Sequence, residues 1–228
     1  MSAVDRVLRY VAGTPTVCQT YCTYGLPPEL YVTVDVSYNC HADSKSHTGV
    51  SIHYGRFSTP FISMSKKQSV IADSSTAAEF IGAHTGAQAI MWARNFLVEL
   101  GFHQKGATCM YQDNTIRLIG HKGNTGRMKH IALRYDFVRL GTIRIEHLHT
   151  TKMTADTLTK PLGTSLFAQH AIRLLNTSPP DPDDLEAYQH SLRSIAKSAK
   201  RITIIRLSNV HLPLRTAKLL RRRVRWSL

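Results

Sequence analysis

Four acidic residues, Asp35, Glu79, Asp113 and Asp156, are spaced so that one folded chain could bring their carboxylates together. Each falls beside the expected end of a strand or the start of a helix, and ligand sites in open α/β sheets collect at the carboxyl ends of strands. Carboxylates gathered there would repel one another and raise their pKa values unless a cation neutralised them. Hard carboxylate oxygens suit Mg²⁺. The pattern therefore predicts a metal site in which the four carboxylates form one open cluster.

Glu79 has a second interpretation. In the stretch SSTAAEF (residues 74–80), Thr76 and Glu79 have the spacing of a capping box, in which two side chains satisfy each other's backbone N–H groups at a helix start. Glu79 would then be a helix cap that contributes about 1 kcal/mol. On the other interpretation Glu79 is a metal ligand on the first turn, and Thr76 or Ser75 caps the helix. These seven residues alone leave both interpretations open.

Hydrophobic periodicity predicts the elements that would position the first two acids. Residues 29–39 alternate between apolar and polar side chains, which predicts a strand with Asp35 near its end and opposite its aliphatic face. Residues 48–65 contain two further strand candidates around a turn at 54–56. From Thr76 onward apolar residues recur every three or four positions until Gly101, which predicts a helix of about seven turns. The residues expected to face the core are Phe80, Ala83, Ala87, Ile90, Ala93, Leu97 and Leu100.

The remaining elements complete a mixed α/β order. Residues 108–113 form a short apolar run that ends in Asp113, and residues 143–150 predict a last strand. Helical patterns cover residues 115–121 and 128–141, and residues 154–175 supply at least one more helix, with Asp156 on the turn that leads into it. Three strands followed by helix, strand, helix, strand and helix are typical of an α/β domain.

Composition and charge limit the function classes. The chain has 228 residues, of which 43% are hydrophobic, and it has neither a signal-peptide pattern nor an apolar run of membrane-spanning length. We therefore expect a cytoplasmic or nuclear protein that is not secreted. The four cysteines and their neighbouring histidine lack the ligand spacing of a zinc site.

The net charge of +14 is concentrated at the C-terminus. Residues 187–228 contain 11 Lys or Arg and no Asp or Glu, whereas the first 186 residues contain 18 basic and 15 acidic side chains. Residues 176–186 are rich in proline and acid, which indicates a linker. The basic tail beyond it is either a poorly folded extension or an arm that binds phosphates.

Five blocks of the sequence identify a family resemblance. VDVSYN, SKKQSVIADSSTAAEF, YQDNTIRLIGH, GRMKHIALRYDFVR and ADTLTKPL occur in the order and spacing of the ribonuclease H domain of copia-type retrotransposon polyproteins. The resemblance covers about residues 3–176, and the opening AVDRVLRYVAGT resembles the end of the adjoining reverse transcriptase. The expected organisation is a reverse transcriptase end at 1–28, a ribonuclease H-like domain at 29–176, and a linker with a basic tail at 177–228.

The resemblance implies a fold and an activity. The fold is the ribonuclease H fold, a mixed five-stranded α/β sheet with flanking helices, here followed by the basic tail. The activity is cleavage of the RNA strand of RNA–DNA hybrids with two Mg²⁺ ions, or Mn²⁺ in their place. The family's catalytic and metal-binding carboxylates correspond to Asp35, Glu79, Asp113 and Asp156, with Asp35 as the bridging ligand.

Partners follow from the same resemblance. They are the RNA–DNA hybrid, the reverse transcriptase and other parts of the polyprotein, and no membrane. Candidates for nucleic-acid contact are Lys66, Lys67, Gln68, Asn114, Arg127, Lys129, His130 and Arg134. Many copia-type sequences have a second acid at the position of Ser37, although no member of the tetrad is replaced. The alternative is a catalytically silent nucleic-acid-binding fragment of a decayed retrotransposon.

Overall fold

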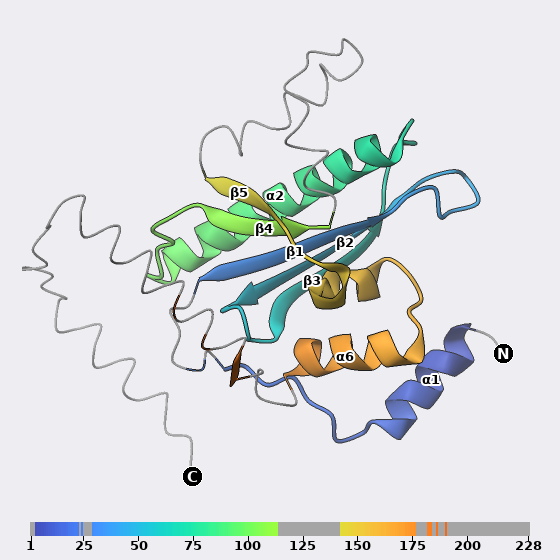
Figure 1. Ribbon diagram of the computed structural model, residues 1–228, viewed down its shortest axis with the longest axis horizontal. Coiled ribbons are helices and arrows are strands. Elements are labelled where there is room, and N and C mark those ends of the chain that lie inside the picture. Colours follow the sequence, from blue (N-terminus) through green and yellow to red (C-terminus); the bar gives the residue numbers. More distant parts are fainter. Residues whose placement is uncertain are drawn as a thin grey trace, which may run out of the picture. The chain divides into compact units, whose positions relative to one another are not determined.

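A five-stranded mixed sheet is the centre of the structure, which is a computed structural model (Figure 1). The structure describes residues 3–22, 24, 29–113 and 142–176, together with 182, 183, 186 and 190. The chain divides into two compact units, Met1–Pro180 and Asp181–Leu228, and the elements below belong to the first. The assignment of residues 1–28 to a reverse transcriptase and of 177–228 to a linker and tail stays a prediction.

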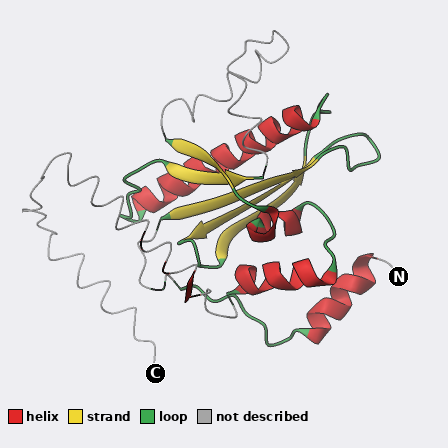
Figure 2. Ribbon diagram, viewed as in Figure 1, coloured by secondary structure: helices red, strands yellow, loops and turns green. Residues whose placement is uncertain are grey.

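The strands have the mixed arrangement that was expected. Their order across the sheet is β3-β2-β1-β4-β5, with β1–β2 and β2–β3 antiparallel and β1–β4 and β4–β5 parallel. The mixed five-stranded sheet with flanking helices is therefore confirmed (Figure 2). The strands are β1 (Leu30–Ser37), β2 (His47–Tyr54), β3 (Pro60–Lys67), β4 (Thr108–Gln112) and β5 (Ile143–His147).

One face of the sheet packs against the long helix α2 (Ser75–Glu99). The aliphatic face of β1 meets this helix closely, because a Cβ added at Gly86 would lie 2.6 Å from Val34 Cγ2 and one at Gly82 would lie 2.3 Å from Val36 Cγ2. Of the seven apolar residues expected to face the core, six are buried, and Leu100 is exposed because it is the C-cap residue. Gly101, with φ of 85°, ends the helix as predicted.

The start of α2 differs from the expected capping box. Ser74 is the N-cap residue, with extended backbone angles, and its hydroxyl accepts a hydrogen bond of 3.1 Å from the Ala77 N–H. Ser75 and Thr76 are already helical, so neither has the non-helical backbone that a cap requires, and both cap predictions were wrong. Glu79 consequently lies just beyond the first turn.

The opposite face of the sheet is covered by two 3₁₀ turns and a helix. These are η3 (Thr150–Lys152), η4 (Thr154–Leu158) and α6 (Thr164–Leu175). The turn η4 packs directly on β2, because a Cβ added at Gly49 would lie 2.7 Å from the carbonyl oxygen of Ala155. Helix α1 (Ala3–Gly13) contacts α6 through the rings of Tyr10 and Phe167, whose centroids are 5.9 Å apart (Figure 1).

Two predicted helices, at residues 115–121 and 128–141, and the basic tail lie outside the described residues. Within the described part of the chain, no helix has the length and apolar character to cross a membrane.

Candidate active site

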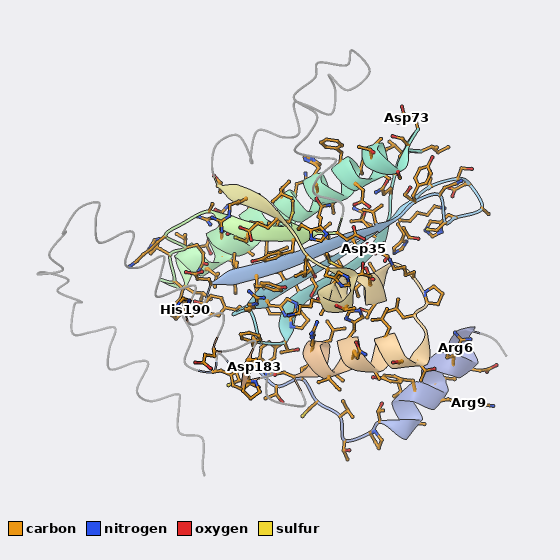
Figure 3. All side chains as sticks on the ribbon, in the orientation of Figure 1. Arg6, Arg9, Asp35, Asp73, Asp183 and His190 are labelled. Atoms are coloured by element: carbon orange, nitrogen blue, oxygen red, sulfur yellow. The ribbon has the colours of Figure 1, made fainter. Side chains whose placement is uncertain are left out.

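The position of Asp35 follows from the alternation of β1. Its neighbours Val34 and Val36 point to α2, so the Asp35 side chain points to the other face, where η4 lies (Figure 3). Asp35 is opposite Gly49 in the β1–β2 register. Since Gly49 has no side chain, η4 can approach this point of the sheet and cover Asp35, which is only 1% exposed.

Asp156 reaches the same place from the turn η4. It is fully buried, and within the described part of the structure neither of its carboxylate oxygens accepts a hydrogen bond. Burial, followed by the charge of Asp35, raises the pKa of Asp156. A buried carboxyl group in this state either takes up a proton or is balanced by a nearby cation.

Glu79 and Asp113 complete the group from α2 and from the end of β4. Burial, followed by the charges of Asp113 and Asp35, raises the pKa of Glu79 to about 8. Glu79 Oε2 also lies 3.5 Å from the side-chain nitrogen of Gln112. Burial and then the charge of Asp35 likewise raise the pKa of Asp113.

The charges of Asp35, Asp113 and Asp156 thus contribute to the raised pKa of Glu79, and the charge of Asp35 contributes to the raised pKa values of Asp113 and Asp156. The cluster is not open as predicted, because Asp35, Glu79 and Asp156 are each less than a tenth exposed. Among the described residues, α2 and η4 cover the two faces of the sheet here, and Asp113 is the half-buried member of the group.

Two residues of the site, Thr159 and Lys160, were not predicted from the sequence. The hydroxyl of Thr159 donates to Asp35 Oδ2. Lys160 Nζ lies 3.5 Å from Asp35 Oδ2 and 3.4 Å from Asp156 Oδ1. Although burial acts against it, the carboxylates of Asp35 and Asp156 raise the pKa of Lys160. Both residues lie in the quoted block ADTLTKPL, and Lys160 is four residues after Asp156, a spacing that could have indicated the pair.

The donor set suits a divalent cation, since the four carboxylates supply hard oxygen ligands and Asp156 has oxygens without hydrogen bonds. No three His, Cys, Asp or Glu side chains of the described residues are already arranged as a metal-binding group. The structure instead places the ammonium of Lys160 against Asp35 and Asp156.

Three of the eight predicted nucleic-acid contacts, Lys66, Lys67 and Gln68, belong to the part of the chain that the structure describes. Lys66 and Lys67 are exposed at the end of β3, and Lys67 pairs with Asp43 at 2.8 Å. Gln68 is buried, and its side-chain nitrogen donates to Thr48 Oγ1 and to the Ala78 carbonyl, each at 3.0 Å. The five other candidates lie outside the described residues: Asn114, Arg127, Lys129, His130 and Arg134.

A cavity of about 270 Å³ lies between the end of β3 and α2. No acidic side chain lines it, and both lysines do, so its charge is suited to an anion. Its lining residues are Thr48, Lys66, Lys67, Gln68, Ser69, Ile81, His84, Thr85 and Gln88.

Comparisons with known proteins give relatives for most of the chain. It is 32% identical over 181 residues to the retrovirus-related Pol polyprotein from transposon RE1 of Arabidopsis thaliana, which covers 76% of this chain and 12% of that protein. The Pol polyprotein from transposon RE2 of the same plant is 34% identical over 173 residues, with 73% of this chain and 12% of that protein covered. The Pol polyprotein from transposon TNT 1-94 of Nicotiana tabacum is also 34% identical, with 72% and 13% covered.

The chain thus spans only 12–13% of the length of these curated relatives. No family model matches it. Among solved structures, a crystal structure of LC11-RNase H1 in complex with an RNA/DNA hybrid aligns with a TM-score of 0.45 and 11% identity, over 57% of this chain and 94% of that one.

Proposed function

Because the chain is homologous to copia-type, retrovirus-related Pol polyproteins over about three-quarters of its length, we propose that it is a ribonuclease H-type nuclease of retrotransposon origin. Its substrate is the RNA strand of an RNA–DNA hybrid, and its partners are the hybrid and other parts of the polyprotein. The observation that supports this proposal is that the charges of Asp35, Asp113 and Asp156 all act on Glu79, and that Asp35 and Asp156, which lie 121 positions apart in the sequence, both contact Lys160.

In this proposal the four carboxylates hold two divalent ions, Mg²⁺ or Mn²⁺. When bound, such ions activate a water molecule and stabilise the departing oxygen of a phosphodiester. The charge of Asp35 acts on each of the other three acids, so Asp35 would hold a bound ion together with them. Thr159 fixes the Asp35 carboxylate by donating to Oδ2.

Residues at the end of β3 can also position the substrate. Lys66 and Lys67 are exposed cations at the cavity beside α2, where they can contact backbone phosphates. Gln68 contributes indirectly, because its hydrogen bonds join the end of β3 to Ala78, one residue before Glu79. Half-buried Asp113 gives the substrate its access to the cluster.

A second candidate function is that of a binding module, which binds an RNA–DNA hybrid without cleaving it. The observation on its side is Lys160, whose ammonium lies 3.5 Å from Asp35 Oδ2 and 3.4 Å from Asp156 Oδ1 and balances one of their two charges. Under this proposal the fold and the exposed cations Lys66 and Lys67 serve nucleic-acid binding alone.

One assay separates the two candidates. Purified protein is incubated with Mg²⁺ and an RNA–DNA hybrid labelled on either strand, with DNA duplex and RNA duplex as matched substrates. The nuclease proposal expects cleavage of the RNA strand of the hybrid alone, and a chelator should stop it. Intact hybrid that is nevertheless bound would instead support the silent module.

A further inference from the structure

The side chain of Lys160 occupies the space between two carboxylates that the proposed function assigns to metal ions. Its Nζ atom is 3.5 Å from Asp35 Oδ2 and 3.4 Å from Asp156 Oδ1. The exposed fractions of the two carboxylate side chains are 2% and 0%, whereas that of Lys160 is 38%. A buried carboxylate without a counter-charge is strongly unfavourable, so Lys160 stabilises the arrangement of these two acids.

The ammonium of Lys160 can move away from both carboxylates. Both distances exceed the roughly 2.7–2.9 Å of a strong charge-assisted hydrogen bond. Neither oxygen of Asp156 accepts a hydrogen bond within the described structure. The lysine is partly exposed and has a flexible four-carbon stem, so its charge can move toward solvent while its backbone stays in place.

Asp35 would keep a partner if Lys160 moved. Its Oδ2 atom also accepts the hydrogen bond from Thr159, which belongs to the same segment as Lys160. Asp156 has no such second contact in the described structure, so its need for a cation would persist. The geometry therefore favours replacement of the Lys160 ammonium by another cation over movement of the ammonium that leaves Asp156 without a cation.

A divalent ion at this site would need the oxygens that Lys160 faces, and two cations at the same carboxylates repel each other. We propose that Lys160 is a tethered counter-ion, which holds Asp35 and Asp156 together in the cation-free protein and is displaced when a divalent cation binds. The proposal rests on the proposed function. Its consequence is that Lys160 stabilises the cation-free site and weakens the binding of the cation.

The test compares direct Mn²⁺ binding, measured by isothermal titration calorimetry, in wild type and in Lys160→Met. The substitution keeps an unbranched side chain of similar length and removes the charge. We expect the dissociation constant for Mn²⁺ to fall at least about tenfold, because the cation no longer competes with an ammonium. In chelator, the same variant should unfold at a lower denaturant concentration than wild type, and Mn²⁺ should raise that midpoint more than it does for wild type.

Lys105→Met is the matched control. Lys105 is exposed and precedes β4, whose length of roughly 16 Å separates it from Asp113 at the other end of the strand. The substitution removes one positive charge, as Lys160→Met does. Its dissociation constant should stay close to that of wild type. If Lys160→Met does not fold without metal, Lys160→Gln replaces it, because an amide can still donate a hydrogen bond to Asp156.

The outcomes separate this inference from the proposed function. Unchanged or weaker Mn²⁺ binding in Lys160→Met, with binding abolished in Asp156→Asn, would overturn the exchange and leave the metal site standing. Absence of Mn²⁺ binding in both wild type and Lys160→Met would overturn the exchange and the metal site together. Tighter binding in Lys160→Met alone, with Lys105→Met unchanged, supports the exchange.

Discussion

At the residue scale, the carboxylates of this site have pKa values that depend on the fold. Burial raises the pKa values of Glu79, Asp113 and Asp156, and the charge of Asp35 adds to the effect in every case. Residues whose pKa values are shifted by burial and by specific charges are candidates for function. Two of these residues, Asp113 and Glu79, allow direct tests.

Replacement of Asp113 by Asn keeps the shape of the side chain and removes one negative charge. If Asp113 is a ligand, divalent cations should bind more weakly and hybrid cleavage should fall by orders of magnitude. Hybrid binding should persist or strengthen, because a charge that repels phosphate is gone. If Asp113 merely caps the segment that follows, Asn is an almost equally good cap and activity should not change. Cleavage rates and hybrid affinity, measured side by side, distinguish the two roles.

Glu79 should make the stability of the metal-free protein depend on pH. Burial and the charges of Asp113 and Asp35 raise its pKa from 4.5 to about 8, so folding is coupled to proton uptake. The stabilisation is complete below the unfolded pKa and is lost as the pH rises toward about 8. The free energy of unfolding in chelator should therefore decrease from about pH 4.5 to about pH 8.

Denaturant unfolding of wild type and Glu79→Gln at several pH values measures this effect. The amide cannot ionise, so the variant should lose most of the slope, and Asp113 and Asp156 should contribute a smaller slope of the same sign. Equal slopes in the two proteins would show that Glu79 is ionised in the folded state.

At the element scale, two local contacts decide where the acids lie. The N-cap of α2 sets the start of the helix that carries Glu79, and the absence of a side chain at Gly49 lets η4 bring Asp156 to β1. Each contact has a matched control within the chain.

Ser74→Ala should lower the free energy of unfolding by about 1 kcal/mol, because the Ala77 N–H loses its acceptor at the helix start. Thr76→Ala should have a much smaller effect, since Thr76 lies inside the helix. Denaturant unfolding of the two variants checks this order, which would be reversed if the Thr76–Glu79 capping box were the true cap.

Gly49→Ala should destabilise the protein and impair the site. Its Cβ would lie 2.7 Å from the Ala155 carbonyl oxygen and 2.9 Å from Leu158 Cβ, so η4 must move away from β2. Overpacking of this kind costs about 1–3 kcal/mol, and hybrid cleavage should fall with it because Asp156 moves as well. Gly106→Ala is the control, since nothing lies within 4 Å of its added Cβ. Equal unfolding midpoints in the two variants would contradict the close packing of η4.

At the scale of the whole molecule, charge is divided between the ends of the sequence. The first 186 residues are nearly balanced, whereas residues 187–228 carry 11 basic and no acidic side chains. We predict that this tail, which apart from His190 lies outside the described residues, adds affinity for nucleic acid that depends on salt and not on sequence, because bound phosphates release counterions.

Removal of residues 187–228 should flatten the slope of log affinity against log salt concentration, with little change in the preference for hybrid over duplex. Hybrid-binding titrations at several salt concentrations measure both quantities. An unchanged slope would show that the phosphate contacts come from the first 186 residues instead.

Much of this protein was determined by the sequence alone. The alternation of residues 29–39 predicted β1 and the orientation of Asp35, and the apolar period after residue 75 predicted α2 and its buried residues. The resemblance to copia-type polyproteins was confirmed by the homologues. These features were predictable because alternation and helical periodicity depend on neighbouring residues, and because the resemblance rests on short continuous stretches of sequence.

Only the tertiary structure decided which elements bury the carboxylates and which positive charge lies beside them. The contacts of Thr159 and Lys160 with Asp35 join residues more than 120 positions apart, and they form because Gly49 admits η4 to the sheet. Periodicity along the chain holds no information about such a contact. The same packing covers both faces of β1, so three of the four acids are buried and a lysine becomes the counter-charge for two of them. That the four acids form one metal site stays a prediction from the sequence, whereas the packing of η4 on the sheet determined the burial of Asp35 and Asp156 and their contacts with Lys160.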